Sequence, residues 1–361
     1  MRKIFASILI FFLSTNTFSE QLSNQDVDIA SGSTVSNDSG LTIQQLTGGP
    51  YTVVNAGTIE ASNITSNSST IRIEVDTTVT NSGLIDTAGS KNLNSILFID
   101  NSGSNSLTNS GTIQTETTGD YGQAIHVQDT SVTAITNSSG GTIKVTDSAL
   151  NSGAIRINTG GSVNTITNNG TISAVGTTHS RGIISISTAT IDRITNTGTI
   201  SASGSSNSNH GIVFWNNSGT SITNSGTIQG TGGSYGYGIR IGESGNISSI
   251  TNSGTIKGSK DGIANSNTIT SIINTGTITG TSGYSIHNVE ASITNLTNSQ
   301  NNLTLIGNVP TNYYVKVNSS SSYGKVSFTS ASGSMNDGIA NSNTITSIIN
   351  TGTITGTSGY S

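Results

Sequence analysis

One short stretch of the chain gathers charged side chains at a spacing suited to catalysis. Arg72, Glu74 and Asp76 alternate with isoleucine and valine, so an extended strand would present all three on one face. Two converging carboxylates with a nearby cation are the groups with which polysaccharide-cleaving enzymes perform acid–base chemistry. Asp86 and Asp100 follow closely enough in sequence to join them. The other acidic residues are scattered, so the pattern favours a solvated strand face with an Arg–Glu pair, and we expect no enzyme activity.

Metal and cofactor chemistry are not expected. The four histidines have no spacing typical of metal ligands, and the chain has no cysteine. The glycine- and aspartate-rich nonapeptide that binds calcium in other repeat proteins is absent from the sequence. We therefore interpret the histidines as single outward-facing side chains. They are His126, His179, His210 and His287.

Aromatic side chains are rare and are candidates for ligand binding. Five of them sit beside or within runs that should form strands, where they would stack on sugar rings or contact a protein partner. The alternative is that they cover the corners of the fold. The five are Tyr121, Trp215, Tyr235, Tyr237 and Tyr284.

A recurring threonine raises a third hypothesis, ice binding, which needs two threonine columns two residues apart on one flat face. One column is present at Thr58, Thr112, Thr142, Thr171, Thr199, Thr227, Thr255 and Thr277, interrupted by Leu84. The position two residues further on includes Glu60, Lys144 and Lys257. Charges in the second column make ice binding the weaker alternative.

The element that must position all these residues is a repeat. The octet Ile-Thr-Asn-Ser-Gly-Thr-Ile-x recurs, and its glycines fall at 57, 83, 111, 141, 170, 198, 226, 254 and 276. A fixed period in this range predicts a stacked-repeat architecture. Each period holds three short runs in which apolar residues alternate with polar ones, separated by Gly, Asn and Ser, which favour turns.

Three short strands with one inward stripe bury nothing alone, but stacked copies bury a continuous column. The sequence therefore predicts an all-β fold, a right-handed parallel β-helix (solenoid) of about ten coils of about 28 residues. Ile125, Ile155, Ile239 and Ile256 should point into one core. The alternation places His126, Arg156 and Arg240 on the outside.

The asparagine of the octet should form a structural ladder. One asparagine per coil would stack at a corner, where side-chain amides hydrogen-bond from coil to coil. The following glycine would supply a left-handed backbone. Asn196→Ala in the middle of the rod should cost more stability than Asn81→Ala near its end. The predicted ladder consists of Asn81, Asn109, Asn168, Asn196, Asn224, Asn252 and Asn274.

Composition and the chain ends suggest export. Arg2-Lys3, a short apolar stretch and a small, polar end predict a signal peptide over residues 1–19, and no segment is long enough to span a membrane as an apolar helix. The net charge is −5, only 9% of residues are charged, and no basic patch is evident, so we expect no nucleic-acid partner.

The sequence divides into further segments after the signal peptide. We expect an N-terminal capping segment at 20–44, β-helix repeats at 45–300, and a non-repeat, hairpin-like junction module at 301–335. Residues 336–361 resume the repeat: the 25 residues from Asp337 copy those from Asp261 letter for letter. Because the copy stops inside a coil, we expect the chain to be a fragment.

The repeat resembles a known family. Tandem ITNSGTI-type coils behind a signal peptide are similar to the passenger regions of Gram-negative autotransporters. The stretch LTLIGNVPTNYYVKVNSSSSYGKVSF (303–328) resembles a segment near the junction to the outer-membrane barrel in autotransporter-like proteins of marine alphaproteobacteria. The resemblance implies an exported rod, displayed on the cell surface, that adheres to a surface glycan or protein. It also implies an outer-membrane barrel in the full-length protein, although no such barrel follows in this chain.

Overall fold

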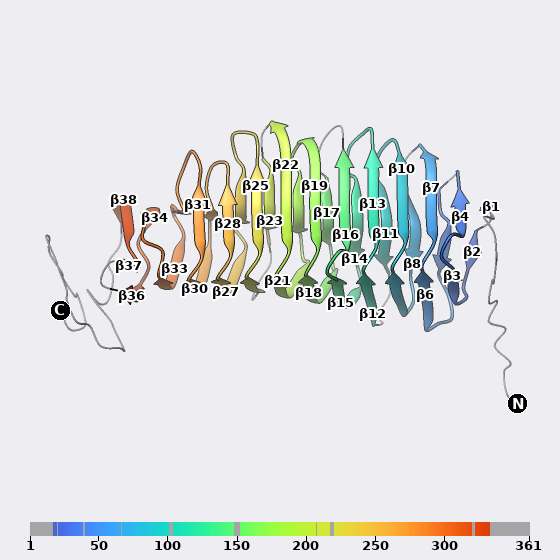
Figure 1. The fold of residues 1–361 in the computed structure, drawn as a ribbon, viewed down its shortest axis with the longest axis horizontal. Helices are drawn as coiled ribbons and strands as arrows, with labels where there is room; N and C mark the ends of the chain where they lie inside the picture. Colours follow the sequence, from blue (N-terminus) through green and yellow to red (C-terminus); the bar gives the residue numbers. More distant parts are fainter. Residues whose placement is uncertain are drawn as a thin grey trace, which may run out of the picture.

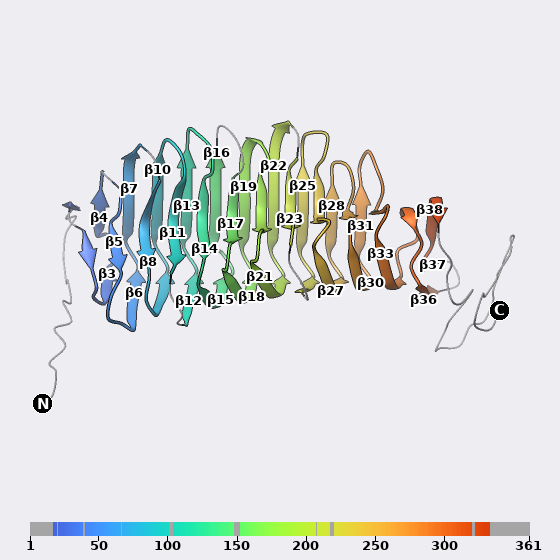
Figure 2. The same ribbon diagram turned by 180° about the vertical axis from the view of Figure 1, so that it is seen from behind.

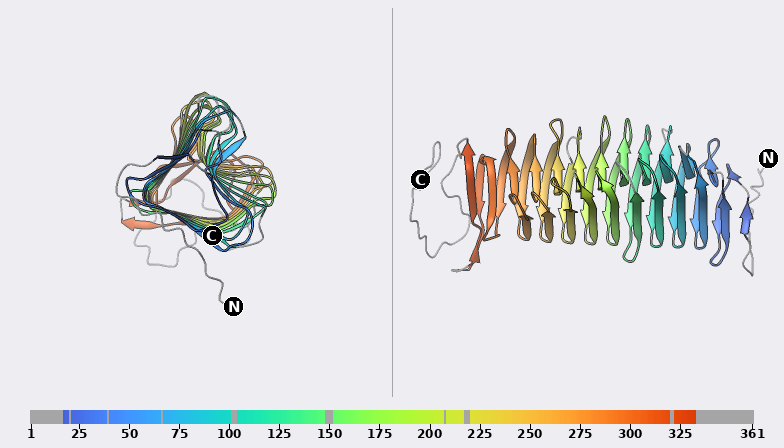
Figure 3. Two further views of the ribbon diagram at one scale, coloured as in Figure 1. Left: turned by 90° about the vertical axis from the view of Figure 1, so that its right-hand side faces the viewer. Right: turned by 90° about the horizontal axis from the view of Figure 1, so that it is seen from above.

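The computed structural model is a long rod of stacked β-strands (Figure 1). It describes residues 17–19, 21–38, 40–65, 67–100, 104–147, 152–206, 208–216, 220–319 and 322–332. Three parallel sheets, A, B and C, run the length of the rod, with 11, 13 and 12 strands. Seen down the long axis, successive coils superimpose into a three-sided outline (Figure 3). At about 4.8 Å per strand the longest sheet spans roughly 60 Å.

The chain visits the three sheets in turn, and each strand pairs with its counterpart in the next coil (Figure 2). Sheet A contains β1 (Thr17–Ser19), β4 (Thr34–Asn37), β7 (Thr58–Ile64), β10 (Leu84–Gly89), β13 (Thr112–Thr117), β16 (Thr142–Asp147), β19 (Thr171–Thr178), β22 (Thr199–Ser206), β25 (Thr227–Thr231), β28 (Thr255–Gly258) and β31 (Thr277–Gly280).

Sheet B contains β2 (Leu22–Ser23), β5 (Ile43–Gln45), β8 (Ser68–Ile73), β11 (Leu93–Ile99), β14 (Gln123–Gln128), β17 (Gly153–Asn158), β20 (Arg181–Ser185), β23 (His210–Phe214), β26 (Tyr237–Ile241), β29 (Ile263–Asn265), β32 (Ile286–Asn288), β34 (Leu303–Asn308) and β38 (Val326–Ser332).

Sheet C contains β3 (Val27–Ile29), β6 (Tyr51–Asn55), β9 (Thr77–Asn81), β12 (Asn105–Asn109), β15 (Ser131–Asn137), β18 (Ser162–Asn168), β21 (Thr190–Asn196), β24 (Thr220–Asn224), β27 (Asn246–Asn252), β30 (Thr268–Asn274), β33 (Ser292–Asn298) and β35 (Asn312–Val315). No helix in the described part of the chain is long and apolar enough to cross a membrane.

The predicted fold class and strand register are confirmed. Ile125, Ile155, Ile239 and Ile256 are fully buried in one hydrophobic cluster that runs from the first coils to the last. His126, Arg156 and Arg240 lie on the other face and keep part of their surface exposed. A register shifted by one residue would exchange the two sets, which would cost ~1.5–3 kcal/mol for every isoleucine exposed.

The motif asparagines stack in a single buried column at the corner between sheets C and A. Each side-chain Nδ2 donates to the Oδ1 of the asparagine in the next coil at 2.7 to 3.1 Å. The same Nδ2 also donates to backbone carbonyls at the corner, as Asn168 does to Gly170 and Thr199. The column includes three asparagines that the sequence-based ladder left out, Asn55, Asn137 and Asn298.

One expectation about this corner is wrong, and the unequal stability cost of Asn196→Ala and Asn81→Ala stays a prediction. Asn81 makes the same set of bonds as Asn196 and is equally buried, because Asn55 extends the column beyond it. The motif glycines are absent from the residues with left-handed backbone. Glycine is required for a different reason: a Cβ on Gly198 would collide with the carbonyl oxygen of Gly170 in the preceding coil.

The segment boundaries at the two ends also differ from expectation. Strands β3, β4 and β5 pair in parallel with β6, β7 and β8, so the described residues of the segment 20–44 build coils of the rod rather than a separate cap. The two long runs of 301–335 are not a hairpin, because β34 and β38 are parallel neighbours in sheet B; only β36 (Val317–Ser319) and β37 (Ser322–Tyr323) are antiparallel.

The described residues include little of two other predicted segments. Of the predicted signal peptide only Thr17–Ser19 is described, as β1, which pairs with β4. The resumed repeat at 336–361 lies outside the described residues.

The buried column makes a testable prediction about stability. Asn168→Ala should lower the free energy of unfolding by roughly 2 to 4 kcal/mol, because it removes several hydrogen bonds and leaves Asn137 Nδ2 without its side-chain acceptor. Asn164→Ala, on the same strand but with an exposed side chain, is the matched control and should change little. Urea unfolding of both variants measures this difference in the free energy of unfolding. Similar small losses for the two variants would mean that the asparagine column does not stabilise the rod.

Candidate functional site

The outer face of sheet B carries two neighbouring columns of side chains whose composition differs from the rest of the rod. In the first column, Asn94, Gln123, Gly153, Arg181, His210 and Tyr237 lie in register on successive strands. In the second column the register brings together Arg72, Leu97, His126, Arg156, Ile184, Val213 and Arg240. We call these two columns the sheet B face.

The sheet B face concentrates the arginines of an acidic protein. It holds four of the six arginines in the chain: Arg72, Arg156, Arg181 and Arg240. Neither column contains an acidic side chain at these positions. The expectation that the protein has no basic patch is therefore wrong, because strand register brings together arginines that are far apart in sequence.

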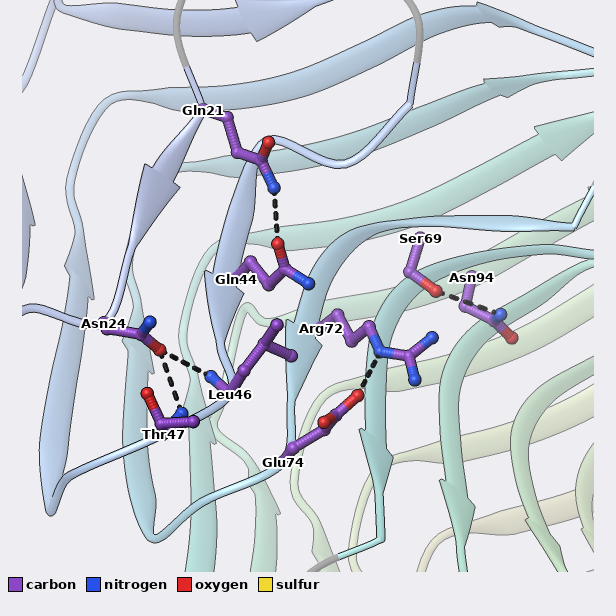
Figure 4. Close-up of polar contacts among 9 residues, drawn as sticks. All are labelled: Gln21, Asn24, Gln44, Leu46, Thr47, Ser69, Arg72, Glu74 and Asn94. Carbon is purple, nitrogen blue, oxygen red and sulfur yellow. Dashed lines mark hydrogen bonds and ion pairs between the residues drawn. The ribbon is translucent and has the colours of Figure 1, made fainter.

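The N-terminal half of the sheet B face is hollowed. A cavity of about 450 Å³ extends across β8, β11, β14 and β17, and its walls contain arginine, histidine, tyrosine, serine and six amide side chains but no carboxylate. Tyr121, which is 42% exposed, forms part of its rim. At its N-terminal end Arg72 Nε donates to Glu74 Oε1 at 2.5 Å, and Asn94 Nδ2 donates to Ser69 Oγ at 3.2 Å (Figure 4). The Gln21–Gln44 bond and the Asn24 bonds to the backbone fix the adjoining coil (Figure 4).

The C-terminal half of the sheet B face is a packed cluster of cations and rings. The guanidinium carbon of Arg240 lies 4.6 Å from the centre of the Trp215 ring and 5.5 Å from that of Tyr237. Tyr237 also stacks on His210, with ring centres 4.9 Å apart. These contacts hold the Arg240 cation against aromatic faces, a geometry that stabilises a positive charge without neutralising it.

Several polar atoms of the sheet B face are buried without a hydrogen-bond partner. They include both ring nitrogens of His210, which is only 1% exposed, together with His126 Nε2, Arg156 Nε and Arg240 Nε. A buried donor or acceptor without a partner costs ~1–3 kcal/mol. Such atoms at a recess are more typical of a ligand-binding site than of a purely structural surface.

Burial on this face lowers the pKa of two histidines and of Arg181. Burial lowers the pKa of His126 to about 3, and the Arg156 cation adds to the shift. Burial, with help from Arg181 and Arg240, lowers the pKa of His210 well below its ordinary value. Burial also lowers the pKa of Arg181 to about 10, with Arg156 and Arg240 contributing, which still leaves this guanidinium protonated at pH 7.

The candidate catalytic residues are only partly brought together. Arg72 and Glu74 form the ion pair described above, whereas Asp76 lies at the next corner, where its Oδ1 accepts from the Ser104 amide. Asp86 lies on β10 in sheet A, where burial raises its pKa, and Asp100 follows the end of β11. Among the described residues no group of three or more histidine, aspartate or glutamate side chains could hold a metal ion.

Of the five candidate aromatics, Tyr121, Trp215 and Tyr237 belong to the sheet B face or its rim, as described above. Tyr235 lies before β26 at 47% exposure, beneath Lys260, whose Nζ is 4.4 Å from the ring centre. Tyr284 lies before β32 with a half-buried side chain. The aromatic residues chosen from the sequence therefore include part of the site, whereas the sequence analysis did not predict the arginines and amides that lie between the rings.

Threonine columns are present on two sheets. The sheet A column has the interruption and the charged neighbours that the sequence indicated. Sheet C carries a second threonine column, from Thr80 to Thr251, that has no interruption. Its neighbouring column, from Thr78 to Ser271, holds mostly serine and threonine but is interrupted by Ala134 and the exposed Arg193.

No protein-family model, no curated protein and no solved structure matches this chain.

The environment of His126 predicts that its imidazole stays neutral under mildly acidic conditions. Its NMR signals should not titrate between about pH 8 and about pH 5, and Arg156→Gln should raise its pKa by removing a neighbouring cation. Because the folded pKa lies below the unfolded value of 6.5, this group's contribution to stability is lost as pH falls from 6.5 towards 3. His126→Gln assigns the signal, and an ordinary titration near pH 6.5 would contradict the burial of this ring.

Proposed function

We propose that the protein is an exported adhesive rod, displayed at the cell surface in the manner of an autotransporter passenger, and that it binds its ligand on the sheet B face. The sequence supports export through the N-terminal basic and apolar pattern and the absence of cysteine. The repeat supports display, because coils that contact only their neighbours can fold one after another as the chain emerges.

One observation carries the assignment of the ligand site. The sheet B face combines a cavity of about 450 Å³, a row of arginines, the exposed ring of Tyr121, the half-buried ring of Trp215 and many amide side chains. Binding sites for polar ligands are concave and hold a few convergent polar groups with aromatic surfaces. Long side chains held on a stiff sheet lose little additional freedom when a ligand binds, which favours affinity.

Binding without turnover is proposed because of the carboxylate geometry. Acid–base cleavage of a glycosidic bond needs two carboxyl groups across the bond. Glu74 is already paired with Arg72, Asp76 accepts a backbone bond, and Asp86 lies on another sheet. The polysaccharide-cleaving enzyme therefore stays the alternative proposal, and released reducing ends would identify it.

Ice binding stays a second alternative, and one structural observation, on sheet C, favours it. The paired hydroxyl columns of sheet C meet the spacing requirement better than sheet A does, although Arg193 projects from their centre. A thermal hysteresis assay separates this function from adhesion.

Adhesion through the sheet B face predicts a specific pattern of binding losses. Wild-type protein should be retained on at least one member of a panel of immobilised neutral and acidic polysaccharides. Tyr121→Asn removes an aromatic rim residue, and asparagine tolerates the left-handed backbone found there (φ 65°). It should weaken retention by about tenfold, as loss of an aromatic contact does at other interfaces. Tyr323→Asn, at an exposed tyrosine on β37, is the control and should bind normally; equal losses, or no binding to any polysaccharide, would overturn the proposal.

A further inference from the structure

We propose that the ligand of the sheet B face is an acidic polysaccharide that lies lengthwise along the rod, with carboxylates paired to Arg156 and Arg240 and to the terminal guanidinium nitrogens of Arg72, whose Nε already donates to Glu74. This inference rests on the proposed function and names its ligand class. The chemistry that would be recognised is a chain in which carboxylates are separated by uncharged, hydroxyl-rich sugars.

The spacing of the arginines is the first reason. Arg72 and Arg156 are three strands apart in the second column, and Arg156 and Arg240 are again three strands apart. At about 4.8 Å per strand the cations recur roughly every 14 Å along roughly 29 Å of rod. An anionic ligand that contacts all three must be elongated and must run along the axis.

The side chains between the cations are the second reason. Asn94, Gln123, Gln128 and Asn158 line the cavity between Arg72 and Arg156. Amides offer both donors and acceptors, which suits sugar hydroxyls. Farther along, Trp215 is half-buried, and Arg240 covers one face of its ring, so a sugar paired to Arg240 would contact the exposed part of the indole.

The buried atoms without partners are the third reason. His210 is 1% exposed, and neither ring nitrogen has a partner, while it lies in register between Arg181 and Tyr237. His126 Nε2 and Arg156 Nε are likewise buried without a partner on adjacent strands. A ligand rich in hydroxyl and carboxylate oxygens supplies acceptors for the guanidinium groups and both donors and acceptors for neutral imidazoles.

Charge density favours a polysaccharide over nucleic acid. Duplex DNA carries one charge per ~1.7 Å of axis, far denser than cations spaced roughly 14 Å apart. The protein as a whole has a net charge of −5, so a dense polyanion would be repelled outside the sheet B face. A sparsely charged chain places its carboxylates at the arginines and leaves the acidic remainder of the rod uncovered.

The test compares binding of matched polymers by isothermal titration calorimetry at low salt. Hyaluronan oligosaccharides, in which each carboxylate is followed by an uncharged sugar, are the acidic probe of the proposed class. Alginate and polygalacturonate, with a carboxylate on every sugar, are the more densely charged acidic probes, and the same polymers with their carboxyl groups reduced to alcohols serve as neutral probes. At least one acidic polymer should bind, and its reduced form should bind at least about tenfold more weakly, because charge-assisted hydrogen bonds are lost. Affinity should fall as salt rises and should rise with oligosaccharide length.

A pair of double variants then locates the site. R156Q/R240Q should weaken binding of the acidic polymer at least about tenfold. K144Q/K257Q removes the same charge from the outer face of sheet A and should bind within about twofold of wild type. Circular dichroism checks that each variant is folded, and the polymer comparison on wild-type protein needs no variant at all.

The outcomes separate the two levels of the proposal. Equal binding of an acidic polymer and its reduced form, or binding of neutral polymers only, would overturn the acidic ligand and leave adhesion through the sheet B face standing. Tighter binding of duplex DNA or polyglutamate than of every acidic polysaccharide would also overturn it, in favour of nucleic acid or an acidic protein. No binding to any polysaccharide would overturn both proposals.

Discussion

The hydrogen bonding between successive coils is the constraint on which the rest of this structure depends. Each strand pairs in parallel with its counterpart in the neighbouring coils, so a residue type placed once per repeat becomes a column along the rod. The asparagine column shows the energetic side of this rule, because its amides satisfy one another inside a corner from which water is excluded. The glycine column shows its steric side, since the backbones at that corner approach too closely for a Cβ.

Pairing between coils also aligns residues that are far apart in the sequence into one surface with its own chemistry. On the outer face of sheet B the side chains lie outside the main core cluster, so the residue type can differ from coil to coil while the strands stay in register. Arginine in every third strand of the second column, amides between Arg72 and Arg156, and rings beside Arg240 then share one face on a stiff support. Recognition along such a face depends on spacing along the axis, because the strand separation is the same in every coil.

Much of this architecture could be predicted from the sequence, and the exceptions have physical causes. Alternation around Ile125 and Ile155 fixed which side chains are inside, because a wrong register would expose many isoleucines. The sheet B face was missed because Arg72 and Arg240 are 168 residues apart (240 − 72). Only strand register aligns them in one column, and loops whose length varies from coil to coil hide that register in the sequence. The motif glycine was wrongly predicted to have a left-handed backbone, because the sequence of one repeat does not show how closely the backbones of adjacent coils approach.

Fluorescence of Trp215 tests the central claim most directly, that ligand binds along the outer face of sheet B. It is the only tryptophan in the chain and lies against Arg240, so its emission reports on this face alone. Titration with an acidic polysaccharide that the protein binds should change the emission saturably, with the midpoint at the dissociation constant measured by calorimetry. Binding of the same polymer with no change in Trp215 emission would place the ligand elsewhere on the rod and contradict the account.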